Sequence, residues 1–296
     1  MNYKSGFVAI IGRPNVGKST LLNAMIGQKI AIMSNRPQTT RNRIRGVRTT
    51  ETSQTIFIDT PGIHTPHHRL GEYMVEVATQ TLKEVDLVLF VVDSTTGVHP
   101  GEIEIVKQFA SVKTPIFLVL NKVDLVDKPK LLDRIHDYQE IYAFDEYVPV
   151  SALKEDQTGV LVSLIEERLP DGPKFYPDDM VTDYPEQFII TEIIREKVLQ
   201  LTQEEVPHSV MVDVEQMERR NNDTVYVNAV IYTERDSQKG ILIGKQGQML
   251  KRVGELARRD LEGLLGNRLY LELWVKVKKD WRNRPTVLRQ FGFQDE

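Results

Sequence analysis

The chain has 296 residues, of which 41% are hydrophobic and 27% charged, and its formal net charge is −4. This length predicts two domains, and the composition is that of an ordinary chain that can bury a core. The apolar runs fall far short of the roughly 18–20 residues of a membrane-spanning helix, and the lack of cysteine excludes disulfides, thiolate metal sites and a catalytic thiol, so we expect a protein of the reducing cytoplasm.

Apolar runs of strand length alternate with helical patterns in the first half of the chain. The runs are nearly continuous in Val, Ile, Leu and Phe, which is typical of parallel strands covered by helices on both faces. The expected strands are 7–11, 55–58, 87–92, 116–120 and 147–150, and the expected helices are 19–25, 73–84, 102–110 and 160–168. The first run is too short for a signal peptide, and we interpret it as a buried strand. This order predicts an α/β domain with a mostly parallel sheet.

The character of the sequence changes near residue 170. The stretch LPDGPKFYPDDMVTDYPE at 169–186 holds four prolines and a Pro-Asp-Gly turn signal, which indicates an interdomain linker. Beyond it we expect a helix at 186–201, strands at 209–217 and 224–232 joined by the turn RRNND, helices at 237–242 and 248–264, and a strand at 268–278 before a basic tail. We therefore predict a first domain at 1–170, a linker at 171–185 and an α+β domain at 186–296.

The segment GRPNVGKS at 12–19 lies between a predicted strand and a predicted helix. It fits the pattern G-x-x-x-x-G-K-[ST], in which glycines let backbone N–H groups face phosphates at a helix N-terminus. Lys18 is then expected to bridge the β- and γ-phosphates, and Ser19 to bind Mg²⁺. The segment predicts a phosphate-binding loop for a nucleoside triphosphate.

The segment DTPG at 59–62 follows another predicted strand. Asp59 can hold Mg²⁺, and the N–H of Gly62 can reach the γ-phosphate. The loop NRPQTTRNRIRG at 35–46 lies where a segment ordered by γ-phosphate and Mg²⁺ would sit, with Thr40 as its predicted metal-binding threonine and Thr39 as the alternative. Its arginines are either solvated charges or contacts for a partner; they are Arg36, Arg41, Arg43 and Arg45.

The segment NKVD at 121–124 selects the base. The carboxylate of Asp124 can accept from N1–H and N2–H₂ of guanine, whereas adenine offers no such pair and would leave the carboxylate unpaired. Lys122 can lay its alkyl stem over the base, Asn121 can tie this loop to the phosphate loop, and SAL at 151–153 can bring an N–H to guanine O6. Because ligands of open α/β sheets bind at the carboxyl edge of the strands, these segments predict a guanine-nucleotide site.

The four segments, in this order, resemble the translation-factor-related GTPases. The chain is similar to the branch with a hydrophobic residue where Ras-like proteins carry a catalytic glutamine, because Ile63 stands at that position. Nothing in Ile63 can orient a water, so we expect slow intrinsic hydrolysis, with catalysis assigned to Lys18, Asn15 and Gly62. Members with asparagine at the position of Asn15 are often activated by potassium, so the resemblance implies K⁺ beside Mg²⁺; a plain turn residue is the alternative.

The predicted GTP-binding set collects these loops. It comprises Gly12, Arg13, Pro14, Asn15, Val16, Gly17, Lys18, Ser19, Thr20, Asp59, Thr60, Pro61, Gly62, Ile63, Asn121, Lys122, Asp124, Ser151, Ala152 and Leu153. The predicted Mg²⁺ set is Ser19, Thr40 and Asp59.

The segment GKQG at 244–247 follows the apolar ILI and opens a helix, unlike GLLG at 263–266, which reads as a helix end. The order helix–strand–strand–helix–GxxG–helix–strand resembles the type II KH fold, whose loop clamps about four nucleotides. From residue 237 to 290 there are 13 Lys and Arg against 5 Asp and Glu, as phosphate contacts require. The predicted RNA-binding residues are Ile243, Gly244, Lys245, Gln246, Gly247, Lys251 and Arg252. At least two of the apolar residues 241–243 are expected to pack in the core.

A KH module behind this type of GTPase domain resembles one family over nearly the whole chain, the Era GTPases, and the ending VKVKKDWRNRPTVLRQFGF also looks like theirs. The resemblance implies binding of 16S rRNA near its 3′ end, a role in assembly of the 30S ribosomal subunit, and peripheral association with the inner membrane. We expect a monomer. The alternative is a regulatory GTPase whose second domain docks a protein or a membrane surface in place of RNA.

Overall fold

The computed structural model describes residues 2–34, 36, 38–220 and 224–293. The chain forms two compact units that divide between Asp183 and Tyr184, with residues 34, 36 and 68–70 grouped with the second unit. Each unit has its own sheet.

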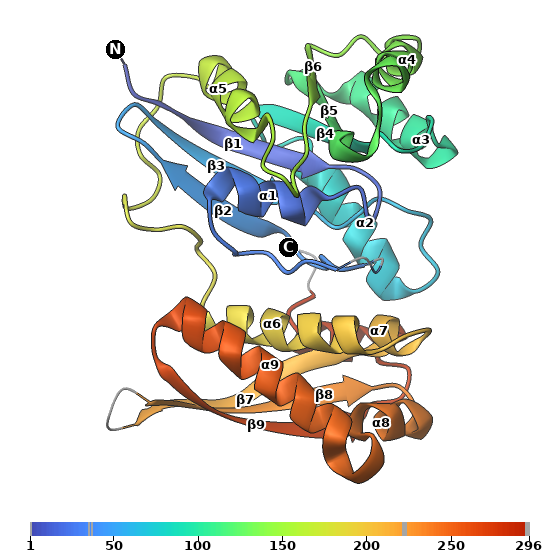
Figure 1. The fold of residues 1–296 in the computed structure, drawn as a ribbon, viewed down its shortest axis with the longest axis vertical. Coiled ribbons are helices and arrows are strands. Elements are labelled where there is room, and N and C mark those ends of the chain that lie inside the picture. The colour runs from blue at the N-terminus through green and yellow to red at the C-terminus, as the bar shows by residue number, and fades with distance from the viewer. Residues whose placement is uncertain (1, 35, 37, 221–223, 294–296) are drawn as a thin grey trace. The chain divides into compact units, whose positions relative to one another are not determined.

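The first unit is a six-stranded sheet with helices on both faces (Figure 1). Its strands lie in the order β2-β3-β1-β4-β5-β6, and β2 alone runs antiparallel to its neighbour. The strands are β1 (Lys4–Ile11), β2 (Ile44–Thr49), β3 (Ser53–Asp59), β4 (Leu87–Asp93), β5 (Ile116–Asn121) and β6 (Glu146–Pro149). This confirms the predicted mostly parallel α/β sheet.

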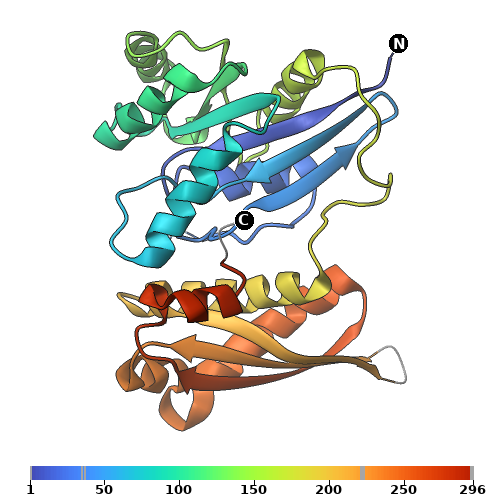
Figure 2. The ribbon, with the colours of Figure 1, turned by 180° about the vertical axis from the view of Figure 1, so that it is seen from behind.

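Helices α1 and α5 cover one face of this sheet, and α2 and α3 cover the other (Figures 1 and 2). The helices are α1 (Lys18–Ile26), α2 (Arg69–Thr81), α3 (Pro100–Gln108), α4 (Lys128–Gln139) and α5 (Thr158–Arg168), with short 3₁₀ turns η1 (Phe109–Ser111) and η2 (Val123–Leu125). The loops that carry the predicted nucleotide motifs leave the carboxyl ends of β1, β3 and β5, so the fold brings them to one edge of the sheet.

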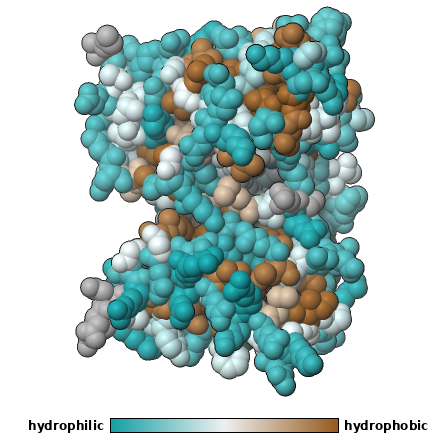
Figure 3. Space-filling view, viewed as in Figure 1, coloured by the Kyte–Doolittle hydropathy of each residue, from teal (hydrophilic) through white to brown (hydrophobic). Residues whose placement is uncertain are grey.

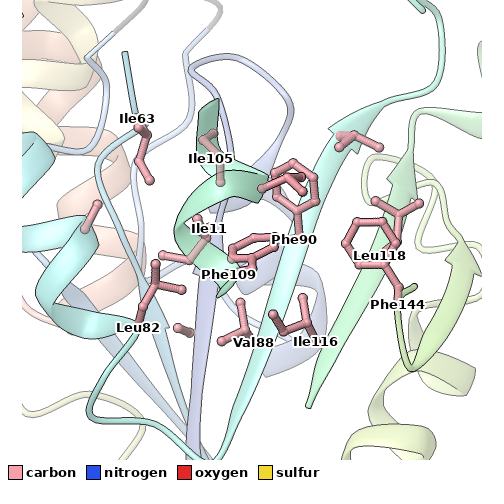
Figure 4. Packing of buried hydrophobic residues seen from close by; sticks show 14 of the residues in the cluster. Ile11, Ile63, Leu82, Val88, Phe90, Ile105, Phe109, Ile116, Leu118 and Phe144 are labelled. Carbon is pink, nitrogen blue, oxygen red and sulfur yellow. The ribbon is translucent and has the colours of Figure 1, made fainter. Parts of the chain in front are cut away.

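An apolar cluster fills the space between the sheet and helices α2 and α3 (Figure 4). Phe90 of β4 meets Phe109 edge-on, with ring centroids 5.3 Å apart. Ile63 belongs to this cluster and is only 7% exposed. The residue at the position of the Ras-like glutamine is therefore a core residue.

Two elements of this unit were not predicted. Strand β2 lies at the sheet edge, and its sequence IRGVRT carries two arginines and a glycine, so neither an apolar run nor strict alternation marks it. It takes up the end of the predicted loop 35–46. Helix α4 is mostly exposed, so it lacks a clear apolar stripe. The sequence marks only its start, where the side chain of Asp127 accepts a hydrogen bond from Lys130 N and a proline lies in the first turn.

The predicted linker 171–185 makes ordered contacts with the first unit up to Asp183. The backbone N–H of Gly172 donates to Tyr3 O at 3.0 Å, and that of Val47 donates to Val181 O at 2.9 Å. The rings of Phe7 and Phe175 lie 5.0 Å apart. This part of the segment therefore packs along the sheet, although its composition resembles a loop.

The second unit packs helices on a three-stranded sheet in the order β7-β8-β9, with β7 antiparallel and β9 parallel to β8 (Figure 1). Its elements are α6 (Glu186–Leu201), α7 (Val206–Ser209), β7 (Met211–Arg220), β8 (Thr224–Thr233), α8 (Asp236–Ile243), η3 (Lys245–Gly247), α9 (Gln248–Leu265), β9 (Arg268–Val277), η4 (Trp281–Asn283) and α10 (Pro285–Gln290). The α–β–β–α–α–β order confirms the predicted type II KH arrangement. Residues 221–223 of the predicted turn RRNND lie outside the described residues.

The predicted basic tail contributes aromatic and aliphatic side chains to this unit's core. Trp281 is fully buried and its indole N–H donates to Ser209 O at 2.8 Å, while Phe291 of the last turn meets it edge-on. Among the described residues, no helix combines the length and the apolarity needed to cross a bilayer.

Candidate nucleotide site and nucleic-acid groove

The phosphate loop connects β1 to α1, and its lysine opens the helix. Lys18 is 6% exposed, and its Nζ donates to the carbonyl oxygens of Gly12 at 3.1 Å and Arg13 at 2.9 Å. Burial lowers the pKa of Lys18 to about 8, and the nearby carboxylate of Asp59 opposes that shift. The loop thus holds one buried cation against its own carbonyl groups.

The three residues of the predicted Mg²⁺ set meet side by side. The hydroxyl of Ser19 donates to Asp59 Oδ2 at 2.7 Å, that of Thr40 donates to the same oxygen at 3.1 Å, and the two hydroxyl oxygens lie 2.9 Å apart. Residues 19, 40 and 59 come from α1, the predicted nucleotide-sensing loop at 35–46 and the end of β3. This geometry favours Thr40 over the alternative Thr39.

The chemistry of this cluster fits a magnesium ion. All three side chains offer hard oxygen atoms, which Mg²⁺ prefers. Asp59 is fully buried, and its Oδ1 has no hydrogen-bond partner among the residues that the structure describes. Burial raises the pKa of Asp59, while Lys18 and the hydroxyl groups of Ser19 and Thr40 act to lower it. A buried carboxylate oxygen without a partner is what a cation would satisfy.

Asn121, the last residue of β5, joins three loops. Its Nδ2 donates to Val16 O in the phosphate loop at 2.8 Å, and its Oδ1 accepts from Ala152 N at 3.0 Å. Gly17 has φ +100°, and a Cβ there would lie 2.2 Å from the amide nitrogen of Asn121, so only glycine fits beside this asparagine. Asn121 therefore links the geometry of the phosphate loop to that of the loops at 121–124 and 151–153.

Asp124 and Ser151 lie together at the predicted base site. Ser151 Oγ donates to Asp124 Oδ1 at 2.6 Å and accepts from Lys154 N at 3.2 Å. The serine thereby orients the carboxylate and leaves Oδ2 available. Leu153, predicted for the same site, is 73% exposed.

Lys122 is held by a residue that the sequence analysis missed. Its Nζ donates to Asn15 O at 2.9 Å and pairs with Asp93 Oδ2 at 2.6 Å. Burial alone would raise the pKa of Asp93, but hydrogen bonds from Lys122 and Thr95 hold it below its ordinary value. Asp93 is the last residue of β4, the strand next to β5. A carboxylate at the end of a buried strand could have indicated in the sequence that Asp93 belongs to the site.

A second missed group holds the side chain of Arg13. Glu102 is fully buried in the first turn of α3, accepts from the hydroxyl of Tyr138 at 2.8 Å, and lies 3.5 Å from Arg13 Nη1. Burial and then the carboxylate of Glu102 raise the pKa of Tyr138. No spacing in the sequence links these residues of three separate elements.

The remaining predicted residues lie in the same loops or, for Thr20, at the start of α1. Thr60 Oγ1 donates to Ile10 O at 2.9 Å, and Ile63 N donates to Gly12 O at 3.2 Å, which keeps the segment after β3 beside the phosphate loop. Pro14, Pro61 and Gly62 complete these loops, and Thr20 lies in the first turn of α1. A Cβ on Gly62 would lie 2.6 Å from Pro14 N.

GKQG forms a tight turn between α8 and α9. Gly244 has φ +71° and Gly247 φ +77°, and a Cβ on Gly244 would lie 2.7 Å from that of Met249. Gln246, at φ 52°, and Lys245 are exposed, as are Lys251 and Arg252 on the first turns of α9. The structure therefore presents GKQG as an exposed basic turn at a helix N-terminus.

The expectation that two of residues 241–243 pack in the core is wrong in part. Leu242 is fully buried, but Ile243 is half-buried and Ile241 is 51% exposed. The three residues end α8, and its helical period turns Gln238 and Leu242 inward together, which leaves Ile241 on the surface.

A groove of about 520 Å³ runs from the GKQG turn along α9 and β9. Figure 3 shows mostly hydrophilic residues on the face that α9 presents in the view of Figure 1. Lys251 was predicted and lines the groove, whereas Arg252 pairs with Glu255 at 3.6 Å. The lining residues that the sequence analysis missed include Leu250, Arg258, Tyr270, Leu271 and Leu273. Periodicity marks α9 and β9 separately but does not show that they flank one groove.

Comparison with known proteins agrees with this geometry. The family model described as 50S ribosome-binding GTPase matches residues 7–122, and the KH domain model matches residues 205–282. A substituted Era of Aquifex aeolicus bound to GDP and AlF₄⁻ is 42% identical, with a TM-score of 0.95, and the match covers 99% of this chain and 100% of that one. An Era in complex with MgGDPNP and nucleotides 1506–1542 of 16S ribosomal RNA is 43% identical, with a TM-score of 0.94 and the same coverage.

Fold and site together define a P-loop GTPase, an enzyme that hydrolyses GTP, joined to a C-terminal KH domain. At this identity over nearly its full length, the chain belongs to the Era family.

Proposed function

We propose that this GTPase is a switch that binds 16S rRNA near its 3′ end through the groove beside GKQG, and that it acts in assembly of the 30S ribosomal subunit. One observation carries the proposal: the same chain joins the Ser19–Thr40–Asp59 oxygen cluster to an exposed basic GxxG turn with a groove behind it. The similar Era that was solved with 16S rRNA and MgGDPNP supports it.

In the proposed mechanism, residues of the first domain position the phosphates. The loop at 35–46 changes its conformation according to whether the γ-phosphate is present. Lys18 supplies a buried cation to the β- and γ-phosphates, and Gly62 offers a backbone N–H. Mg²⁺, held by Ser19, Thr40 and Asp59, supplies positive charge to the phosphate oxygens. Ile63 is packed in the core and offers the attacking water no polar group, so intrinsic turnover is slow and GTP-bound protein persists.

We expect potassium to accelerate hydrolysis through Asn15. A monovalent cation there would add positive charge beside the β- and γ-phosphates. GTP hydrolysis should be at least about tenfold faster in K⁺ than in Na⁺ at equal ionic strength. Asn15→Gly should bring the ratio close to one without straining a backbone that has φ 65°. Equal rates of the unaltered enzyme in the two salts would remove this role of Asn15.

The proposed place of action is the cytoplasm, with a monomer that associates peripherally with the inner membrane. The basic content of residues 237–290 supports an interaction with anionic surfaces as well as with RNA. Co-sedimentation with anionic and with neutral vesicles, with and without RNA, separates the two. If the chain binds neither kind of vesicle, the membrane part of the proposal fails and the RNA part is unaffected.

Binding of single-stranded RNA in the two nucleotide states tests the proposed switch. We expect an RNA resembling the small-subunit rRNA 3′ end to bind more tightly with a non-hydrolysable GTP analogue than with GDP, at a stated salt concentration. Equal affinities would leave an RNA-binding GTPase but contradict the coupling. The absence of RNA binding in both states would favour a second domain that docks a protein or a membrane.

A further inference from the structure

The groove beside GKQG contains a carboxylate, that of Glu255, which phosphate binding does not explain. Its lining includes three leucines, Leu250 on α9 and Leu271 and Leu273 on β9, and such apolar side chains suit the faces of bases. Its charged residues are Lys251, Glu255 and Arg258. Among the described residues that line the groove, Glu255 is the sole carboxylate. A negative charge facing a polyanion weakens binding unless it accepts a hydrogen bond, so the position of Glu255 needs a reason.

The carboxylate of Glu255 is available to a ligand. Its ion pair with Arg252 spans 3.6 Å between side chains that are 59% and 46% exposed, and such an exposed pair is weak. Glu255 and Arg258 are three residues apart on α9, so they lie on one face of the helix, which borders the groove. A base packed against the leucines of the groove would therefore have an acceptor and a donor beside it.

An ionised carboxylate only accepts hydrogen bonds, and this limits the bases that it tolerates. Cytosine, adenine and guanine each carry an exocyclic amino group with two hydrogens to donate. Uracil has none, and its single ring N–H lies between two carbonyl oxygens that a carboxylate repels. On the basis of the proposed RNA binding, we propose that Glu255 is a specificity-determining residue that accepts from the amino group of a base in the groove and selects against uracil.

Single cytosine-to-uracil changes test this selection, because the two bases differ little in size. RNA oligonucleotides with one such change at each successive position should include a position at which the affinity of the full chain falls about tenfold. Replacing that cytosine by a pyrimidin-2-one, which lacks only the amino group, should lower the affinity similarly. Glu255→Gln should reduce the cytosine-to-uracil ratio to within about twofold, since an amide can donate to uracil O4.

Glu218→Gln is the matched control. Glu218 is an exposed glutamate on β7, at the edge of the sheet opposite β9, and its substitution should leave the ratio unchanged. A ratio that Glu255→Gln leaves at its original value would overturn the inference while RNA binding stands. Equal affinity for cytosine and uracil RNAs at every position would do the same. If the unaltered chain binds none of these RNAs, the proposed RNA function fails and this inference with it.

Discussion

Asp124→Asn is expected to shift the nucleotide preference from guanine to xanthine. The carboxylate accepts from two donors of guanine, whereas an amide can donate to the additional oxygen of xanthine. Losing two hydrogen bonds to a charged group should weaken GDP binding by about 10²–10⁴-fold. Ser151 Oγ, now 2.6 Å from Asp124 Oδ1, can still donate to the amide oxygen, so the loop should keep its shape. Calorimetric titration with GDP and with xanthosine diphosphate measures both affinities.

Asp127→Asn makes the same chemical change three residues later and serves as its control. Asp127 caps α4 by accepting from Lys130 N at 3.0 Å, a task that asparagine performs equally well. This variant should bind GDP like the unaltered chain. If Asp124→Asn retained guanine selectivity, the proposed base recognition by NKVD would be wrong.

Replacing both Lys245 and Gln246 by aspartate is expected to abolish RNA binding and leave GTP binding unchanged. Both side chains are exposed, and aspartate tolerates the left-handed backbone of Gln246, so the fold should survive. Two lost phosphate contacts and the added repulsion should weaken binding by about 100-fold or more, and should flatten its salt dependence. RNA affinity at several salt concentrations, together with GTP affinity, gives the result.

Lys279→Asp is the control for charge; it changes the net charge by −2, against −3 for the double variant. Lys279 is exposed and does not line the groove, yet it belongs to the same basic region of the sequence. It should lose far less affinity than the altered GKQG turn. Equal losses would mean that net charge alone attracts the RNA, and unchanged affinity in the double variant would contradict the role of GKQG.

The loops of the nucleotide site were predictable because each follows an apolar strand and carries its chemistry within a few residues. Ser19, Asp59 and Asp124 could therefore be named from local patterns, and the parallel sheet brings their loops to one edge. Asp93 and Glu102 could not be named in this way, because their partners lie on other elements and only the fold brings them together.

The second domain shows the same division between local and distant signals. The GKQG turn was visible because glycines between two helical patterns mark a loop. The groove was not, since residues of both α9 and β9 line it, and no residue spacing shows that these two elements come together. Strand β2 escaped prediction because an edge strand needs only one partner and carries little apolar sequence.

The burial of Ile63 restricts how this enzyme can evolve. A glutamine introduced there without other changes would place an amide among Ile, Leu and Phe side chains, at a loss of stability of about 1–3 kcal/mol if it stayed buried without partners. The neighbouring apolar residues would have to change together before such a side chain could turn toward a nucleotide. An enzyme with this core therefore gains faster turnover more easily from a bound ion or an interacting macromolecule than from a new side chain at position 63.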